Sequence, residues 1–544
     1  MSPKSFANSR LSRRDLLKAS LAIVPMLAAC TESGETDAPL SAARFDHGVA
    51  SGDPATDRVI LWTRATPPTD TGSDVGEVVI DWLLARDPGL SDIVLQGRVR
   101  SDSTTDHTIK IDATGLAPGT VYWYRFTSAT ASSPIGRTRT APVGAVDHLR
   151  FAFVTCADFS RGFYNAYRRV AERDDLQAVV HLGDYIYENG AQDRVRPHQP
   201  PREIVSLADY RERYAQVRRD ADLQALHGQH PMIWVWDDHE VANNAWRDGA
   251  EAHDPATQGA YSDRRAAAFR AAHEWLPIRT PEPGNLARVY RAFSFGDLAD
   301  LTMIDARHIG RDQPVPPNTV FGDGIGAFTQ TGAFADPARQ ILGTEQEAWL
   351  AAQLAASTAR WQLLGNQVYF SPLKLLGAPR ASNLSLFVSN DKWDGYEPAR
   401  DRVLAMLDGL RNPLILTGDA HEAYAFDVTP DPNSLRYNAL SGEGSRAVEF
   451  VVTSTTSRGD APEGLSISGL LERLQTGITP LLRLSNPHLK YLNNRLNGYL
   501  LLDLTPARAQ AEFWTVPMVS SITDEQSLDA VWICDDGTKR LRRG

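Results

Sequence analysis

Four apolar segments of this chain each run into a loop of ligand-type side chains. Short apolar runs bounded by turn residues are typical of buried strands, and open α/β sheets hold ligands at the carboxyl ends of their strands. Four such ends that carry Asp, His, Cys and Tyr favour one shared metal centre over four unrelated loops. The runs are Val154-Thr-Cys156-Ala-Asp158, His181-Leu-Gly-Asp184-Tyr-Ile-Tyr187-Glu188, Trp234-Val-Trp-Asp237-Asp238-His239-Glu240 and Leu414-Ile-Leu-Thr-Gly418-Asp419-Ala-His421.

Residues 146–544 alternate between strand-like and helical patterns. This order predicts an α/β domain with a central sheet covered by helices on both faces. Two long irregular segments, 310–337 and 371–396, interrupt it, and we expect either to form a wall or lid over the site. The helices expected with the clearest periodicity are 162–173, 262–276, 344–358 and 397–410.

Residues 43–145 have the short alternating strands and frequent turns of a β-sandwich. Within them, Leu116-Ala-Pro-Gly-Thr-Val-Tyr122-Trp-Tyr124 is similar to the corner of fibronectin type III sandwiches. A fibronectin- or immunoglobulin-like sandwich is therefore predicted, with Tyr122 and Tyr124 as core residues. Its strands are expected at 58–64, 77–84, 108–112 and 120–127.

Residues 1–30 are predicted to be a targeting segment. Ser12-Arg13-Arg14-Asp-Leu-Leu-Lys18 matches a twin-arginine export signal, and the apolar stretch behind it is too short to span a bilayer. The segment ends in Leu-Ala-Ala-Cys30, the form of a lipoprotein cleavage site, so Cys30 is either lipidated or incidental to cleavage nearby. Residues 31–42 are small, polar and acidic, as in a flexible tether. The implied partners are the twin-arginine machinery and, through Cys30, a membrane; the implied location is periplasmic or extracellular.

The net charge of the chain limits the kinds of molecule that it is expected to bind. The 544 residues carry a net charge of −11, which argues against nonspecific binding to nucleic acid or to an anionic membrane. A small phosphate-ester substrate would therefore have to be attracted locally, and bound cations would do that. With only three cysteines the chain has no disulfide framework.

The residue types predict two different metal sites that share Asp184. Cys156, Tyr187 and His421 offer sulfur, phenolate and imidazole, and a phenolate needs a strong Lewis acid, so this site suits Fe³⁺. Two structural alternatives are open here: a disulfide from Cys156 to Cys534, and Tyr187 as an aromatic packed on the sheet edge.

The second site is built from oxygen alone. Asp184, Asp238 and Asp419 suit Ca²⁺, Mg²⁺ or Mn²⁺. Asp238 and His239 are the predicted catalytic residues, with Asp238 on the second metal and His239 placed to orient or protonate a leaving oxygen. The alternative for Asp237-Asp238-His239-Glu240 is an acid-capped helix N-terminus.

Two adjacent cations can activate a bridging hydroxide and stabilise displacement at phosphorus. Phosphoester hydrolysis by a metal-bound hydroxide or water is therefore the natural reaction, although the residue types alone leave carboxylic esters and amides open.

Together these motifs resemble the PhoD-like alkaline phosphatase family of the calcineurin-like metallophosphoesterase superfamily. The resemblance also covers 45–54, 59–64, 364–368 and 392–396. It implies hydrolysis of phosphomonoesters and, in several members, of phosphodiesters including phospholipids. It implies Fe³⁺ on Cys156, Asp184, Tyr187 and His421, and Ca²⁺ on Asp184, Asp238 and Asp419.

Four functional questions stay open at this point. Ile304-Asp-Ala-Arg307-His308 departs from the family pattern, so the role of Arg307 is open, and Arg161 fits either a phosphate contact or the surface. A phospholipase D-type phosphodiesterase acting on lipid headgroups is the close alternative to a phosphatase. A non-catalytic surface-binding lipoprotein is the alternative of another class.

Overall fold

The computed structural model describes residues 38–68, 76–191, 194–282, 284–321, 325–457 and 478–544. The predicted signal segment and the tether up to residue 37, including Cys30, lie outside the described residues. Among the helices that are described, none combines the length and the apolar character needed to cross a bilayer.

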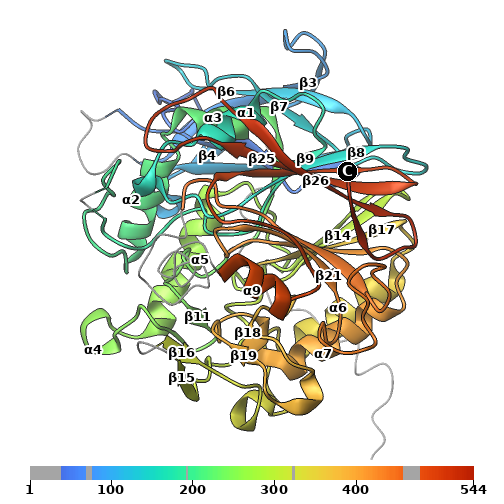
Figure 1. Ribbon diagram of the computed structural model, residues 1–544. Coiled ribbons are helices and arrows are strands. Elements are labelled where there is room, and N and C mark those ends of the chain that lie inside the picture. Colours follow the sequence, from blue (N-terminus) through green and yellow to red (C-terminus); the bar gives the residue numbers. More distant parts are fainter. Residues whose placement is uncertain (1–37, 69–75, 192–193, 283, 322–324, 458–477) are drawn as a thin grey trace, which may run out of the picture.

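Two large sheets form the main body (Figure 1). One has ten strands in the order β27-β26-β25-β24-β8-β9-β10-β1-β2-β5, and the other has seven in the order β13-β14-β17-β20-β22-β21-β23. The ten are Leu541–Arg543, Ser527–Asp535, Arg508–Val516, Asn497–Leu504, Leu149–Val154, Ala178–His181, Pro231–Trp234, Val49–Gly52, Arg58–Arg64 and Thr108–Thr114. The seven are Arg291–Phe295, Ala299–Met303, Trp361–Asn366, Pro413–Thr417, Ala447–Val451, Ala423–Val428 and Leu489–Asn493.

The sheets pack face to face around one core. Phe151 and Val179 from the larger sheet share a buried cluster with Leu301, Leu363 and Phe450 from the smaller one. The central strands β8, β9 and β10 run parallel, as do β14, β17, β20 and β22. Parallel strands covered on both faces need continuous apolar runs, which is why these segments are so apolar in sequence.

Helices cover the outer face of each sheet, which makes four layers. α1 (Asn165–Ala171) and α3 (Ala221–Gln229) lie over the larger sheet, and α6 (Thr344–Ala356) and α7 (Glu397–Asp408) over the smaller one (Figure 1). The prediction of one central sheet with helices on both faces was therefore wrong in its layering. A buried apolar strand has the same sequence pattern whether its second neighbour is a helix or another sheet.

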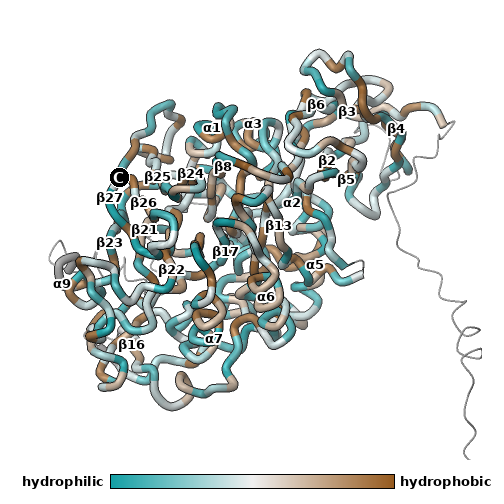
Figure 2. Tube along the Cα trace, turned by 90° about the vertical axis from the view of Figure 1, so that its right-hand side faces the viewer, coloured by the Kyte–Doolittle hydropathy of each residue, from teal (hydrophilic) through white to brown (hydrophobic). Residues whose placement is uncertain are grey.

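The predicted N-terminal β-rich region is present. β4 (Ile93–Ser101), β3 (Val78–Ala85), β6 (Val121–Thr127) and β7 (Gly136–Arg139) form a four-stranded sheet. Its apolar face, with buried Tyr122 and Tyr124, packs on β2 and β5, and Figure 2 shows this region as a lobe beside the main body. The opposing layer is the end of the ten-stranded sheet, because β1 pairs with β10.

Short elements surround the end of the sheets where β8, β9, β10 and β20 finish. The irregular segments expected as walls contain two hairpins, β15–β16 and β18–β19, and a third, β11–β12, follows β10. These strands are Thr319–Phe321, Ile325–Ala327, Lys374–Leu376, Leu386–Phe387, Ala245–Trp246 and Gly249–Ala250, and the remaining helices are α2 Leu207–Val217, α4 Pro255–Gln258, α5 Tyr261–Trp275 and α9 Ile478–Ser485.

Candidate metal centre

The four acid-rich loops meet at the carboxyl ends of their strands, and three of them hold ligand-type residues in strained conformations. Backbone φ is +54° at Cys156 and +59° at Asp184, Asp419 and His421, a region that L-residues rarely occupy. Such strain costs about 1–3 kcal/mol for each residue and persists where a site requires it. Gly183 cannot be replaced without disturbance, because a Cβ there would lie 2.5 Å from the Asp237 backbone nitrogen and Cβ.

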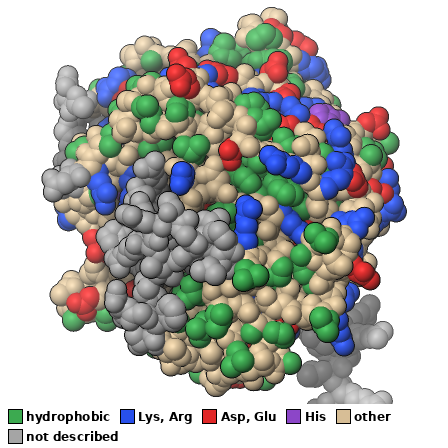
Figure 3. Space-filling model, viewed as in Figure 1, with side chains coloured by type: hydrophobic (Ala, Val, Ile, Leu, Met, Phe, Trp, Pro, Cys, Tyr) green, Lys and Arg blue, Asp and Glu red, His purple; other side chains and the backbone are tan. Residues whose placement is uncertain are grey.

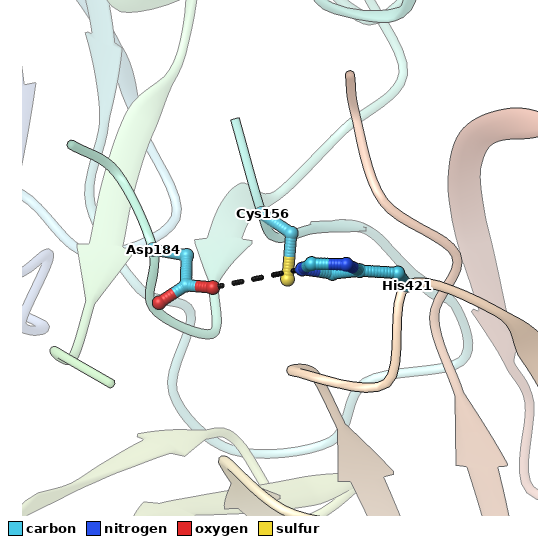
Figure 4. A group of neighbouring side chains, drawn as sticks. All are labelled: Cys156, Asp184 and His421. Atoms are coloured by element: carbon cyan, nitrogen blue, oxygen red, sulfur yellow. Dashed lines mark ion pairs between the residues drawn. The ribbon is translucent and has the colours of Figure 1, made fainter. Parts of the chain in front are cut away.

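The cysteine set comprises Cys156, Asp184, Tyr187 and His421. Ligand atoms of Cys156, Asp184 and His421 all lie within 4.8 Å of one another, and Figure 4 shows the three side chains converging from separate loops. The Tyr187 hydroxyl donates to Asp184 Oδ2 at 2.9 Å and lies 3.2 Å from His421 Nε2. Four potential ligands, three of them contributed by residues far apart in sequence, therefore surround one point.

The carboxylate set comprises Asp237, Asp238 and Asp419, whose oxygens also lie within 4.8 Å of one another. Asp238 belongs to a second such group with Asp184 and His239, so it joins the two sets. The structure thus brings every predicted site residue into one region, with Asp184 and Asp238 at its middle.

Two observations indicate that these residues are suited to bind cations. Among the described residues, Asp184 Oδ1 and Asp237 Oδ2 are buried and have no hydrogen-bond partner, which is costly for carboxylates without a compensating cation. Burial, followed by the charge of Asp184, raises the pKa of the Cys156 thiol and the Tyr187 phenol well above their ordinary values. A bound cation would reverse that effect and stabilise the ionised ligands.

The role of Arg307, which the sequence left open, is to contact several carboxylates at the site. Its fully buried guanidinium donates to Asp419 Oδ1 at 2.6 Å, Asp391 Oδ2 at 2.7 Å and Asp237 Oδ1 at 2.5 Å. The ammonium of Lys392 forms a further ion pair with Asp419. Sequence reasoning gave Asp391 and Lys392 no role; the signal was their place in the irregular segment 371–396, whose part 392–396 carries the family resemblance. Arg307 and Lys392 therefore offset part of the negative charge of the carboxylate set, while Asp237 Oδ2 stays unpartnered in the described chain.

Two glutamates inside the motifs hold the loops in place. Glu240 accepts hydrogen bonds from the backbone nitrogens of Asp184 at 3.1 Å, Tyr185 at 2.6 Å and Asp237 at 2.8 Å. Burial and the charge of Asp184 raise the pKa of Glu240 to about 8. Glu188 accepts from His239 and from the backbone of Asn243, each at 2.7 Å. Both residues orient ligands of the site and were visible in the motifs without an assigned role.

Contacts on its ring fix the orientation of His239. Its Nδ1 bonds to Glu188, and its ring stacks on Tyr187 with centroids 4.2 Å apart. Although burial opposes the charged form, Glu188, Asp184 and Asp238 hold the pKa of His239 well above its ordinary value. Because Nδ1 is occupied by Glu188, Nε2 is the atom left to act on a ligand.

An open pocket of about 640 Å³ lies over these residues. Arg161 also lines it, with Nε 3.3 Å from Asp158 Oδ2, so this cation faces the site rather than the outer surface. The predicted site residues in its lining are Asp184, Tyr187, Asp238, His239, Asp419 and His421. A concave site with a few convergent polar groups is typical of small-molecule binding.

Comparison with known proteins assigns the family. The model of PhoD-like phosphatases matches residues 151–513, and that of their N-terminal domain matches residues 29–142. The chain belongs to the PhoD-like phosphatases. It is 33% identical to alkaline phosphatase D of Bacillus subtilis (strain 168) over 538 residues, which cover 95% of this chain and 86% of that protein. A solved structure of PhoD superposes with a TM-score of 0.80 at 33% identity, covering 93% of each chain.

The predicted resemblance is thereby confirmed, and this PhoD-like chain is a phosphoric ester hydrolase. Two structural alternatives fail. Cys156 and Cys534 are both free, since Cys534 packs in the core on β26 while Cys156 faces the metal centre. Asp237–Glu240 do not cap a helix, because a turn and the hairpin β11–β12 follow them in the described chain.

Proposed function

We propose that this phosphatase is metal-dependent and hydrolyses phosphomonoesters and phosphodiesters. The main observation in support is that ligand atoms of Cys156, Asp184 and His421 lie within 4.8 Å of one another beside a pocket. Thiolate, phenolate and imidazole donors favour Fe³⁺ in the cysteine set. The oxygens of Asp184, Asp238 and Asp419 favour Ca²⁺, with Mg²⁺ or Mn²⁺ as substitutes.

Cations held there would lower the pKa of water and offset charge that develops on the phosphoryl oxygens. Side chains of the protein supply the other catalytic groups. His239 donates a proton from Nε2 to the leaving oxygen, while Glu188 fixes its ring through Nδ1. Arg161 lines the same pocket and binds a phosphoryl oxygen by charge and hydrogen bonding. Asp238 would help to hold a second cation next to this proton donor.

Hydrolysis of p-nitrophenyl phosphate and of bis-p-nitrophenyl phosphate at pH 8–9 tests the proposal, with Ca²⁺ and then with a chelator. Turnover of both esters that is lost on chelation and restored by Ca²⁺ is the expected result. Activity unchanged by exhaustive chelation, with metal content verified as zero, contradicts the metal-dependent mechanism. A strong diester preference would favour the phospholipase D-type alternative.

The pocket volume is the observation that keeps a phospholipase D-type activity as the second candidate. About 640 Å³ exceeds what a phosphate and a small alcohol fill, which leaves room for a second ester arm. Release of headgroup from phosphatidylcholine vesicles, measured beside p-nitrophenyl phosphate, separates the two activities. Because the family is one of phosphatases, the non-catalytic lipoprotein alternative has no support.

We further propose export by the twin-arginine route, with lipidation at Cys30, on the sequence motifs alone. Replacing Arg13 and Arg14 by lysine should retain the enzyme in the cytoplasm, and Cys30→Ala should abolish labelling by radioactive palmitate. On the face drawn in Figure 3, Lys and Arg side chains are interspersed with acidic and hydrophobic ones. This mixture and the net charge of −11 support a small phosphate ester rather than nucleic acid as partner.

A further inference from the structure

The hairpin β11–β12 continues directly from the proton-donor loop. Asn244 directly precedes β11 and contacts the Asp238 carboxylate. Its backbone nitrogen donates to Asp238 Oδ2 at 2.6 Å. The backbone of Asn244 has φ of +52°, and its side chain donates to Glu251 Oε2 at 2.5 Å. The Asn244–Glu251 bond thus closes the hairpin across its base, and the Asn244 backbone ties that base to Asp238, a predicted metal ligand.

Trp246 lies on this hairpin and lines the pocket while being half-buried. Its ring rests on Gly249: a Cβ at that position would lie 2.5 Å from Trp246 Cζ2. Glycine therefore lets the indole lie close against the hairpin. A large aromatic surface held in this way binds ligands at low conformational cost.

Three prolines continue the same wall. The backbone nitrogen of Arg247 donates to the Arg311 carbonyl at 3.0 Å, which places the chain from Arg311 onward beside the hairpin. Pro314, Pro316 and Pro317 follow and line the pocket. We call Trp246 and these three prolines the Trp–Pro wall. It is apolar and locally rigid, unlike the charged floor formed by the cysteine and carboxylate sets.

We propose that the Trp–Pro wall binds the leaving group of the ester and selects uncharged alcohols with a flat or apolar body. The inference rests on the proposed function: the alcohol is the only organic part of a phosphomonoester, so the apolar wall of the pocket, rather than its charged floor, is the surface suited to hold it. The chain that follows His239 forms the wall of the same pocket. Glu251 also lines the pocket beside the wall and disfavours leaving groups that carry further negative charge.

The test compares p-nitrophenyl phosphate, whose leaving group is a flat aromatic alcohol, with glycerol phosphate, whose leaving group is compact and polar. In Trp246→Ala we expect kcat/KM for the aromatic ester to fall roughly five- to tenfold, mainly through KM, and that for glycerol phosphate to change less than about twofold. Trp246→Phe should retain most of the aromatic preference. Each variant is compared with wild type on the same substrate, so the different acidities of the two alcohols cancel.

Trp532→Ala is the matched control, since this half-buried tryptophan lies on β26 near the edge of the larger sheet. It should leave the ratio of the two substrates unchanged. Equal losses on both esters in Trp246→Ala would overturn the inference and show that Trp246 supports Asp238 instead. No loss on either would also overturn it. If wild type with full metal content hydrolyses neither ester, the proposed function itself fails, which is a separate outcome.

Discussion

The two halves of the metal centre balance their charges in opposite ways. In the cysteine set, the buried Asp184 Oδ1 has no hydrogen-bond partner among the described residues, and its neighbours are a thiol, a phenol and an imidazole. In the carboxylate set, Arg307 contacts Asp237, Asp391 and Asp419, and Lys392 pairs with Asp419. Among the described residues no Lys or Arg side chain pairs with the cysteine set, whereas the carboxylate set holds two cations and still leaves Asp237 Oδ2 without a hydrogen-bond partner.

This difference indicates how tightly each half should hold a metal. A cation entering the cysteine set meets no competing Lys or Arg side chain among the described residues, and it compensates the buried Asp184 carboxylate as it binds. A cation entering the carboxylate set competes with a guanidinium and an ammonium for the same oxygens. We expect the first half to hold its metal persistently and the second to exchange with solution Ca²⁺.

Asp184→Asn gives the largest expected effect, because Asp184 belongs to the cysteine set and also to the group with Asp238 and His239 that connects it to the carboxylate set. Loss of this ligand should lower kcat/KM by roughly 10³-fold or more, since metals bound there would supply several kcal/mol of transition-state stabilisation. The isosteric side chain should preserve the fold, so the thermal midpoint of the metal-free variant should match that of metal-free wild type. A fully active variant would refute the assignment of Asp184 as a metal ligand.

Cys156→Ser should remove metal binding by the cysteine set while leaving metal binding by the carboxylate set intact. We expect iron content near zero and activity lowered by roughly 100-fold, while stabilisation by added Ca²⁺ persists. Elemental analysis and thermal unfolding with and without Ca²⁺ measure this. Cys534→Ser is the control, because that cysteine is also buried but lies away from the centre. Retention of full iron in Cys156→Ser would contradict the iron site.

Arg307→Gln should destabilise the metal-free protein by about 3–5 kcal/mol, since it removes the shared partner of several buried carboxylates. Added Ca²⁺ should then raise the thermal midpoint more than it does in wild type, because the internal competitor is gone. Arg311→Gln is the comparison: it is equally buried, but its only side-chain ion pair in the described chain is with Asp391. Equal Ca²⁺ responses in both variants would rule out competition.

Asp394→Asn should give the smallest effect, seen in the pH dependence of stability. Asp394 lies just beyond Lys392, and burial raises its pKa from 3.8 to about 7. The folded protein therefore keeps a proton that the unfolded chain loses, so this group's contribution is full below pH 3.8 and is lost as pH rises through 7. The variant should lose less stability than wild type between pH 4 and 7 in urea titrations. Identical slopes would show that Asp394 is ionised in the folded state.

Much of the centre was predictable from the sequence because its ligands follow strands. An apolar run that ends in Gly183-Asp184 or Gly418-Asp419 identifies a strand end by local chemistry alone, and hard or soft donors indicate the metal they prefer. The helices 344–356 and 397–408 were likewise predicted from their own periodicity, to within two residues. These features depend on residues that are neighbours in the chain.

The tertiary structure decided whatever depends on partners distant in sequence. Whether a strand faces a helix or a second sheet leaves no trace in an apolar run, so the two-sheet core was not predicted. The role of Arg307 is set by Asp237, Asp391 and Asp419, which lie 70, 84 and 112 residues away. Folding brings these charges within hydrogen-bond distance of one another. Because they are then buried, leaving any of them unpaired would cost several kcal/mol of stability, on the order of the penalty for a buried unpaired charge.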